Sequence, residues 1–195
     1  MKTLARFALL IGFLCTAGTG NAETPAEGFR TTTKQSPYTV QGDSIAKLTA
    51  ELNEKGPLDH GEKFHAKTDR QIHWHYRYER KGGGFAITTL TVTADIDCLL
   101  PRRTVPANQP DNLAAQWERY MAALTLHEHG HGQNAIDHAK ALYATLRAHR
   151  VFATSQALEE FIRAEGDKCI ADANAYDVEY DRKTKHGATQ GATLR

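Results

Sequence analysis

Two histidines and a glutamate stand at a spacing that suits metal-dependent hydrolysis. The stretch Leu126-His127-Glu128-His129-Gly130-His131 contains the pattern H-E-x-x-H. In a helix, residues four apart lie on one face, so His127 and His131 can hold the same metal ion. The carboxylate of Glu128 lies one position further round, where it can take a proton from metal-bound water. The pattern therefore predicts a zinc site with His127 and His131 as ligands and Glu128 as general base.

The residues around this pattern favour a metal site over a chance occurrence. In a chain of 195 residues with ten histidines, one accidental H-E-x-x-H has a probability of about 3 per cent. Both histidines also lie on an apolar stripe with three- and four-residue spacings, which is expected to face the interior, whereas His129 points to another side. The stripe comprises Leu113, Trp117, Tyr120, Leu124, His127, His131, Ala135, Leu142 and Leu146.

A third ligand is expected from a second long helix. The helix with the motif should begin at a cap, Asp111, and run to about residue 150, and the next should start at Ser155. With a turn near residues 152–153 the two helices are antiparallel, which brings residues 173–179 opposite the histidines. The ligand should therefore come from the end of the second helix or just after it. The candidates are Asp177, Glu179, Asp181 and His186.

Other residues with metal-binding side chains are less favoured. Asp137 is excluded, because a ligand so soon after the motif requires the chain to turn away from the helix, normally at a glycine that is lacking there. His73 and His75 share one face of an alternating stretch, a spacing that can bind metal. Arg77 and Glu79 continue that face, so a solvated outer surface is the better interpretation.

Alternating apolar and polar residues predict strands before the motif. A bulge is expected near Thr88-Thr89, where the alternation changes parity, and Pro101 is expected to end the last strand. The expected elements are strands at 38–40, 71–79 and 85–100, a turn at 82–84, and a helix from Asp43 or Ser44 to about Asn53. Together with the long helices they predict an α+β fold, in which a small antiparallel sheet packs against the helix with the motif.

The first residues have the pattern of a secretory signal peptide. Lys2 and Arg6 precede an apolar run at 7–15, and small residues lead to a cleavage site after Ala22. The run is too short for a permanent membrane anchor. Removal of residues 1–22 lowers the formal net charge from +1 to −1, which indicates neither nucleic-acid binding nor a basic membrane-binding face. A periplasmic or secreted protein is expected.

The mature length suits a single domain at 36–187. Residues 23–35 are expected to form a flexible leader, because they are rich in Thr, Pro and Gly. Residues 188–195 are expected to form a flexible tail. Export leaves Cys98 and Cys169 as an even pair in an oxidising compartment, which predicts a disulfide between sheet and helix. Two free buried thiols are the alternative.

Several motifs together resemble a bacterial family described as predicted secreted zinc-dependent proteases. The likeness runs from about Tyr38 to Gly187, and its most distinctive part is Tyr180-Asp181-x-x-Thr184-x-His186-Gly187. The other shared features are His127-Glu128-x-x-His131, the signal peptide, Gly56-Pro57, the strand Thr68–Tyr76 with its Trp, and a sheet that ends in Leu100-Pro101.

The resemblance implies a zincin-like site in which His186 is the third zinc ligand beside His127 and His131. It also implies Glu128 as base. Tyr180, Asp181 and Thr184 of the distinctive segment become candidates for oxyanion binding or for support of the ligands, and Asp177 remains an alternative ligand.

The function predicted from these residues is that of an exported zinc metallopeptidase acting on peptides or proteins. Glu128 would take a proton from zinc-bound water and later return it to the leaving amine. Tyr176 or Tyr180 would donate to the oxyanion, with core packing as the alternative role. Two further alternatives are a non-catalytic zinc-binding scaffold, for which a fourth ligand would argue, and a zinc amidase or esterase acting on cell-envelope material. The sequence does not indicate an oligomeric state.

Overall fold

The structure is a computed structural model that describes residues 27–59, 61–105, 111–148 and 151–195. The expected signal peptide, residues 1–22, lies outside the described residues. In the described part of the chain, no helix is both long and apolar enough to cross a membrane.

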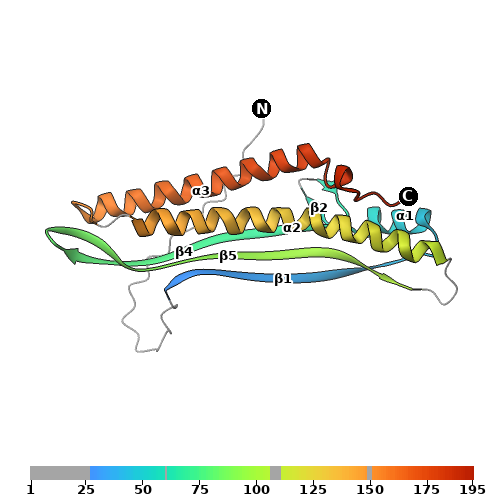
Figure 1. Ribbon diagram of the computed structural model, residues 1–195, viewed down its shortest axis with the longest axis horizontal. Coiled ribbons are helices and arrows are strands. Elements are labelled where there is room, and N and C mark those ends of the chain that lie inside the picture. Colours follow the sequence, from blue (N-terminus) through green and yellow to red (C-terminus); the bar gives the residue numbers. More distant parts are fainter. Residues whose placement is uncertain (1–26, 60, 106–110, 149–150) are drawn as a thin grey trace.

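The fold is α+β, as the sequence predicts, with long helices layered on a small sheet (Figure 1). The main sheet has the strand order β1-β5-β4, and β2 and β3 form a separate two-stranded hairpin. The strands are β1 (Gly28–Gln41), β2 (Leu58–Asp59), β3 (Glu62–Lys63), β4 (Lys67–Lys81) and β5 (Gly84–Thr104). The helices are α1 (Ile45–Lys55), α2 (Asp111–Ala148), α3 (Ser155–Thr184) and the short 3-10 helix η1 (Ala188–Gln190).

Strands β4 and β5 form the antiparallel hairpin that the alternating pattern predicts. Gly82 and Gly83 make its turn at positive φ, a conformation that glycine adopts without strain. The expected bulge is also confirmed. Arg77 pairs with Thr89 and Tyr78 with Ile87, which leaves Thr88 as the extra residue.

Strand β1 corrects two expectations. It pairs with β5 in parallel from Gly28 to Gln41, so the sheet is mixed rather than antiparallel. The segment 23–35 is therefore not a flexible leader from residue 28 onward, and residues 23–26 lie outside the described part. Most of the polar side chains of this edge strand face solvent, which explains why no apolar alternation marks it. Its consecutive threonines 31–33 do have the β-branched shape that strands favour.

Strand β5 continues past Pro101 to Thr104, which corrects the expected end. Leu99 is the last residue of β5 that pairs with β4, and Pro101 pairs with Tyr38 of β1 alone. Pro101 thus lies where β5 has one open side, and there a missing N–H donor is tolerated.

The three helices agree with the predicted spans. Ser44 caps α1, and its hydroxyl accepts from the Lys47 amide at 3.4 Å. Thr154 caps α3 and accepts from Ala157 N at 3.1 Å. Helices α2 and α3 lie antiparallel on one side of the sheet (Figure 1), as predicted for a turn near residues 152–153.

Two hydrophobic clusters hold the layers together. The first joins the sheet to α2 and α3, and contains Ile72, Leu90, Val92, Ala94, Ala139, Leu142, Leu146, Leu158, Ile162 and Cys169. The second joins α1 to the other end of α2, and contains Val40, Leu48, Leu52, Ala66, Cys98, Leu100, Leu113, Tyr120 and Leu124. Each fully buried Leu or Ile side chain contributes about 1.5–3 kcal/mol to folding. The H-E-x-x-H motif follows Leu124 and so lies where the two clusters meet.

The cysteines depart from the predicted disulfide. Cys98 and Cys169 are both buried free thiols, and each belongs to a different one of the two clusters. The Cys169 thiol donates to the backbone oxygen of His138 at 3.4 Å. Burial raises the pKa of Cys98 to about 11, so this thiol stays protonated. Both residues therefore act as small apolar core residues, the alternative that the sequence left open.

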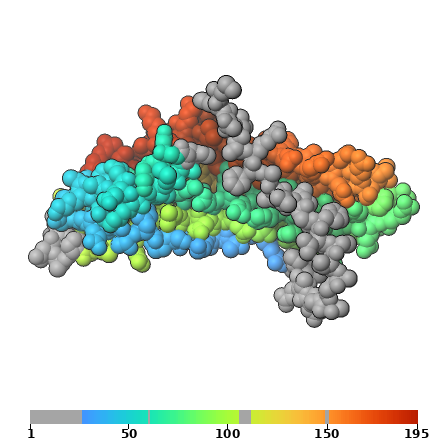
Figure 2. Space-filling model, turned by 180° about the vertical axis from the view of Figure 1, so that it is seen from behind, coloured from blue at the N-terminus to red at the C-terminus, as the bar shows by residue number. Residues whose placement is uncertain are grey.

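The expected flexible tail, 188–195, is an ordered part of the domain. It begins with η1, and Ala192 and Leu194 pack against the second cluster. The amide of Gln116 on α2 donates to the backbone oxygen of Arg195 at 3.1 Å. Figure 2 shows the red end of the chain at the same end of the molecule as the cyan segment with α1 and the β2–β3 hairpin. The candidate site lies between these two segments.

Candidate metal centre

The two motif histidines point into one site from α2. The His127 side chain is 4 % exposed and that of His131 12 %. Their rings lie 4.9 Å apart, as expected for residues four apart on a helix. His129 is exposed on another side of the helix, as predicted.

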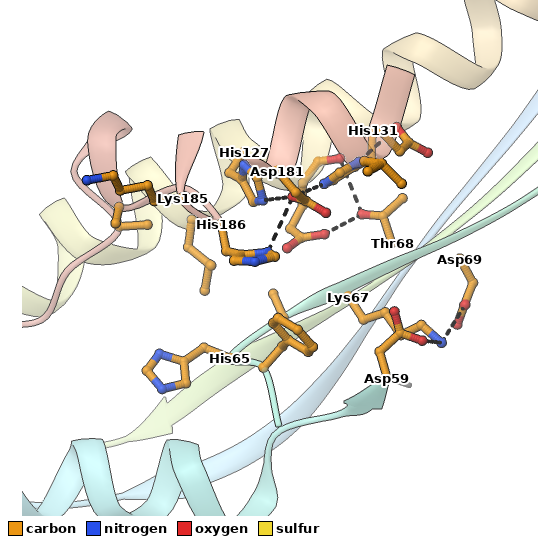
Figure 3. Close-up of a pocket in the computed structure, with 18 of the residues that line it drawn as sticks. Asp59, His65, Lys67, Thr68, Asp69, His127, His131, Asp181, Lys185 and His186 are labelled. Atoms are coloured by element: carbon orange, nitrogen blue, oxygen red, sulfur yellow. Dashed lines mark hydrogen bonds and ion pairs between the residues drawn. The ribbon is translucent and has the colours of Figure 1, made fainter. Parts of the chain in front are cut away.

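Asp181 of α3 completes a group of three potential ligands. Its Oδ1 atom lies 3.2 Å from Nε2 of His127 and 3.1 Å from Nε2 of His131 (Figure 3). One donor atom from each residue lies within 4.8 Å of the other two, so the group can hold a metal ion. Two imidazoles and a carboxylate are a common ligand set of catalytic zinc.

This arrangement brings Asp181, rather than His186, into one group with the two motif histidines. Helix α3 continues to Thr184, so His186 lies beyond its end, in a turn at φ 51°. The His186 side chain is 55 % exposed, and its Nδ1 lies 3.6 Å from Oδ1 of Asp181. His186 therefore lines the rim beside this group, and its role as third ligand stays a prediction from the resemblance.

The spacing of the acidic residues contains a signal that sequence reasoning did not use. Asp177 and Asp181 are four apart on α3, the same spacing as His127 and His131 on α2. On antiparallel helices, two such pairs can face each other with matching pitch. Here both aspartates contact His131, at 2.9 Å through Nδ1 and 3.1 Å through Nε2.

The other ring nitrogen of each histidine is held by a hydrogen bond. Nδ1 of His127 donates to Oε1 of Gln190 at 3.1 Å, and Nδ1 of His131 donates to Oδ1 of Asp177 at 2.9 Å. A hydrogen bond at Nδ1 fixes the tautomer and leaves Nε2 for a metal ion. Both histidines are thus oriented in the way that metal ligands are in proteins.

Asp177 supports the site and does not belong to the ligand group. Asn134 donates to Oδ1 of Asp177 at 2.8 Å, and Arg70 of β4 forms an ion pair with its other oxygen. Burial favours a higher pKa for Asp177, but the hydrogen bond from His131 and the charge of Arg70 bring the pKa below its ordinary value. The network therefore keeps Asp177 ionised beside His131.

In the metal-free protein, His131 is protonated on both ring nitrogens, and a metal ion would replace one of these protons. Burial lowers the pKa of His131, but the hydrogen bonds to Asp177 and Asp181 outweigh burial and raise it to about 9. Burial favours a higher pKa for Asp181, but the hydrogen bonds with His127 and His131 hold this pKa well below its usual range. A divalent cation would supply the positive charge between these groups.

Glu128 is buried next to the three potential ligands and is not a member of that group. Its carboxylate accepts from Oγ1 of Thr68 on β4 at 2.7 Å, and the same hydroxyl lies 3.2 Å from the Glu128 backbone oxygen. Burial raises the pKa of Glu128, while Thr68 and the two histidines oppose the rise. A carboxylate with a raised pKa at a fixed position is suited to general-base work.

Tyr180 packs against the first motif histidine, and its hydroxyl is bonded to the backbone of α2. Its ring stacks on His127 at 5.1 Å, and its hydroxyl donates to the His127 backbone oxygen at 3.3 Å. A Cβ at Gly130 would lie 2.3 Å from that hydroxyl, so the glycine in the motif makes room for Tyr180. Tyr176 is 50 % exposed and stacks on Tyr180. Neither tyrosine lines the cavity.

Thr184, the remaining polar residue of the distinctive segment, contacts His127 and the backbone at the end of α3. Its hydroxyl is buried, donates to the Tyr180 backbone oxygen at 2.8 Å and lies 3.4 Å from Nδ1 of His127. It also accepts from the amide of Gly187 at 3.3 Å. Thr184 thus ties the end of α3 to the first ligand.

The other histidines and acids considered in the sequence lie away from the site. Glu179 pairs with Arg182 at 2.6 Å, and Gln133 donates to the exposed Asp137 at 2.8 Å. His73 lies 3.6 Å from Asp95 on the partly exposed outer face of the sheet, as expected for a solvated strand surface.

A cavity of about 710 Å³ opens onto the ligand group and Glu128. Figure 3 shows α2 and α3 with His127, His131 and Asp181 on one side, and β4 with Lys67 and Thr68 on the other. The cavity leaves open space next to the three potential ligands.

Sequence reasoning missed four residues that hold the site: Thr68, Arg70, Asn134 and Gln190. Each acts through a contact with a residue at least 43 positions away in the chain. No local spacing marks such contacts. Only the Asn134 position carried a signal, since a buried polar residue on an apolar stripe needs a partner.

The comparisons with known proteins place the chain in a family. A family model with the description "Bacterial protein of unknown function (DUF922)" matches residues 35–187. No match was found among curated proteins or among solved structures. The matched region contains His127, Glu128, His131 and Asp181, whereas Gln190 lies beyond it. Because the match covers well over half of the sequence, the chain belongs to this bacterial family of unknown function.

Proposed function

We propose that the protein is an exported zinc-dependent hydrolase that cleaves peptide bonds. The observation that carries this proposal is the place of Glu128, whose buried carboxylate lies beside three potential metal ligands and faces a cavity without being one of them. Among the described residues, the ligand group has three members rather than four. This favours an open catalytic site over a closed structural one.

Each residue of the site has a role in this proposal. When bound, a zinc ion supplies an acidified water and polarises a substrate carbonyl. Glu128 takes the proton of the attacking water and returns it to the leaving amine. Thr68 holds the carboxylate of Glu128 in one orientation through the 2.7 Å hydrogen bond.

The surrounding residues keep the ligands in place. Asp177 and Gln190 hold the two histidines by their Nδ1 atoms, which aims both Nε2 atoms at Asp181. His186 at the rim is exposed to the cavity and can donate a hydrogen bond to the substrate. Since the hydroxyl of Tyr180 is engaged with the α2 backbone, we assign the oxyanion role to His186 instead.

Export is part of the proposal because of the sequence of residues 1–22. The charged start, the apolar run and the small residues before the cleavage site have the order of a secretory signal. The substrate would therefore be a peptide or protein in the periplasm or outside the cell.

The experiment that tests the function compares hydrolysis by the parent protein and by Glu128→Gln. Both are reconstituted with one equivalent of zinc and incubated with a mixed peptide library, and products are identified by mass spectrometry. Glu128→Gln should keep the ion, since Glu128 is not a ligand, while hydrolysis falls by about 10²-fold or more. Glu118→Gln, an exposed change on the same helix, is the matched control. Equal hydrolysis by Glu128→Gln and the parent would overturn the catalytic assignment.

A further inference from the structure

The residues that line the cavity differ between its two ends. One end lies next to His131 and the other next to His127, nearer the start of α2. Lys67, Asp69 and Arg70 of β4 line it together with Asn174 and Asp177 at the end next to His131. At the end next to His127, an apolar patch lines the cavity together with His65, Lys185 and His186 (Figure 3). The patch consists of Phe64, Ala66, Leu124, Ala188 and Ala192.

The apolar patch lies directly beside the proposed base. Leu124 precedes His127 by three residues and Glu128 by four, so all three share one face of α2. Ala66 and Leu124 are 5 % exposed members of the second hydrophobic cluster, and Ala192 packs against the same cluster. The patch is thus a continuation of the core that reaches the cavity surface.

Backbone geometry brings the last segment of the chain against the first ligand. Gly187 has φ +81°, and a Cβ there would lie 3.0 Å from both the His127 ring and Cβ of Ala192. Ala192 therefore sits next to His127. Phe64 closes the other wall, with its ring centroid 5.1 Å from that of His186. The walls come from residues on both sides of the base, and the alanines at 188 and 192 leave space between them.

We infer that this patch is a subsite for an aliphatic or aromatic side chain next to the bond that is cleaved. The inference rests on the proposed function and names its substrate class. An apolar side chain that leaves water for this patch is stabilised in proportion to the apolar area that it buries. A charged side chain would lose hydration there without a partner of opposite charge among the five patch residues. Two of these residues, Ala188 and Ala192, lie beyond the family match at 35–187, so this specificity need not be shared by the family.

The test measures peptide binding, so that it does not depend on turnover. Zinc-loaded Glu128→Gln protein is titrated with end-blocked pentapeptides Ala-Ala-Xaa-Ala-Ala, in which Xaa is Ala, Leu, Phe, Asp or Lys. The Leu and Phe peptides should bind at least about 10-fold more tightly than the Ala peptide. The Asp and Lys peptides should bind no more tightly than the Ala peptide.

Variants of the wall locate the subsite. Ala188→Leu in the same background should fill the space and remove the preference for Leu and Phe. Phe64→Ala should weaken binding of the Leu peptide through loss of one wall, and it serves as the second variant if Ala188→Leu does not fold. Ala171→Leu, at an exposed position of α3 outside the cavity, is the matched control and should change nothing.

The outcomes separate the subsite from the function. Equal affinity for all five peptides, no binding of any peptide, or an unchanged preference in both wall variants would overturn the subsite. If apolar peptides bind with preference but the zinc-loaded parent cleaves no peptide, the subsite stands and the peptidase proposal fails. If the parent cleaves the library without an apolar preference, the subsite fails and the peptidase stands.

Discussion

Arg70 of the edge strand β4 forms an ion pair with Asp177 of α3, across the floor of the candidate site. The two side chains are 13 % and 16 % exposed, so the pair is largely shielded from solvent. Because Asp177 in turn accepts from Nδ1 of His131 at 2.9 Å, Arg70 links the sheet to a potential metal ligand through Asp177. Arg70 also donates to Oδ1 of Asn174 at 3.0 Å, which fixes its own orientation.

Loss of Arg70 should therefore weaken metal binding without removing a ligand. Arg70→Ala leaves Asp177 without its cation, and the acceptor that aligns His131 becomes free to move. Zinc affinity, measured by competition with a chelator, should fall by about 10–100-fold. Stability of the metal-free protein should fall by about 1–3 kcal/mol. Arg77→Ala, at an exposed position of the same strand, is the control, and an equal loss in both variants would contradict a specific role for Arg70.

The ligand set is tested by the metal content of three variants. His131→Ala and Asp181→Ala should each bind less than about a tenth of an equivalent of zinc after reconstitution, because each deletes a ligand. His186→Ala should keep most of the metal and lose hydrolysis instead. Elemental analysis after gel filtration gives the result. If His186→Ala loses the ion while Asp181→Ala retains it, the third ligand is His186.

Gln190 should orient the ring of His127 in the way that Asp177 orients the ring of His131. Gln190→Ala removes the acceptor for Nδ1 of His127, and zinc affinity should fall by about 10–100-fold. Gln190→Glu retains an acceptor oxygen and should restore most of the affinity. The exposed Gln156→Ala controls for the loss of a glutamine. Equal zinc affinities in Gln190→Ala and the parent protein would remove Gln190 from the site.

His65 should make stability depend on pH. Its Nε2 donates to Oδ1 of Asn53 at 2.9 Å, and Nδ1 accepts from the buried Tyr120 hydroxyl at 2.8 Å. Burial lowers the pKa of His65 below its ordinary value of 6.5, so between the two pKa values the unfolded chain binds more protons. The stability due to His65 is therefore fully present above about pH 6.5 and is lost as the pH falls toward the folded-state pKa.

Urea denaturation of the metal-free parent and of His65→Gln at pH 8 and pH 5 checks this sign. The stability difference between the two proteins should shrink at pH 5. A constant difference would mean that folding leaves the pKa of His65 unchanged, and a difference that grows on acidification would mean that folding raises this pKa.

The helices and the motif were predictable because their signals are local. The apolar stripe and the caps at Ser44 and near Ser155 depend on residues within a few positions of each other. Strand β1 could not be recognised in the same way. Its pairing with β5 needs no apolar side chains on an edge, and the hydrogen-bonded partner lies far away in the chain.

The third ligand shows where spacing and resemblance reach their limit. The antiparallel helices do bring the end of α3 to the motif histidines, but whether Asp181 or His186 lies within the group depends on where that helix ends. A sequence pattern fixes the end of a helix only to within one or two residues. Likewise, the small residues of 188–195 gave no apolar signal, and the role of Gln190 depends on a tertiary contact 63 positions away.

The parallel pairing of β1 with β5 makes folding depend on contacts between distant parts of the chain. Partners such as Lys34 and Asp97 are 63 positions apart, and such non-local pairing is formed slowly because a large loop must close first. The candidate site adds contacts of the same kind, since Gln190 lies 63 positions from His127 and Asp177 lies 107 positions from Arg70. The site therefore forms only when these segments have come together, and a metal ion that binds there would stabilise the folded chain rather than guide its folding.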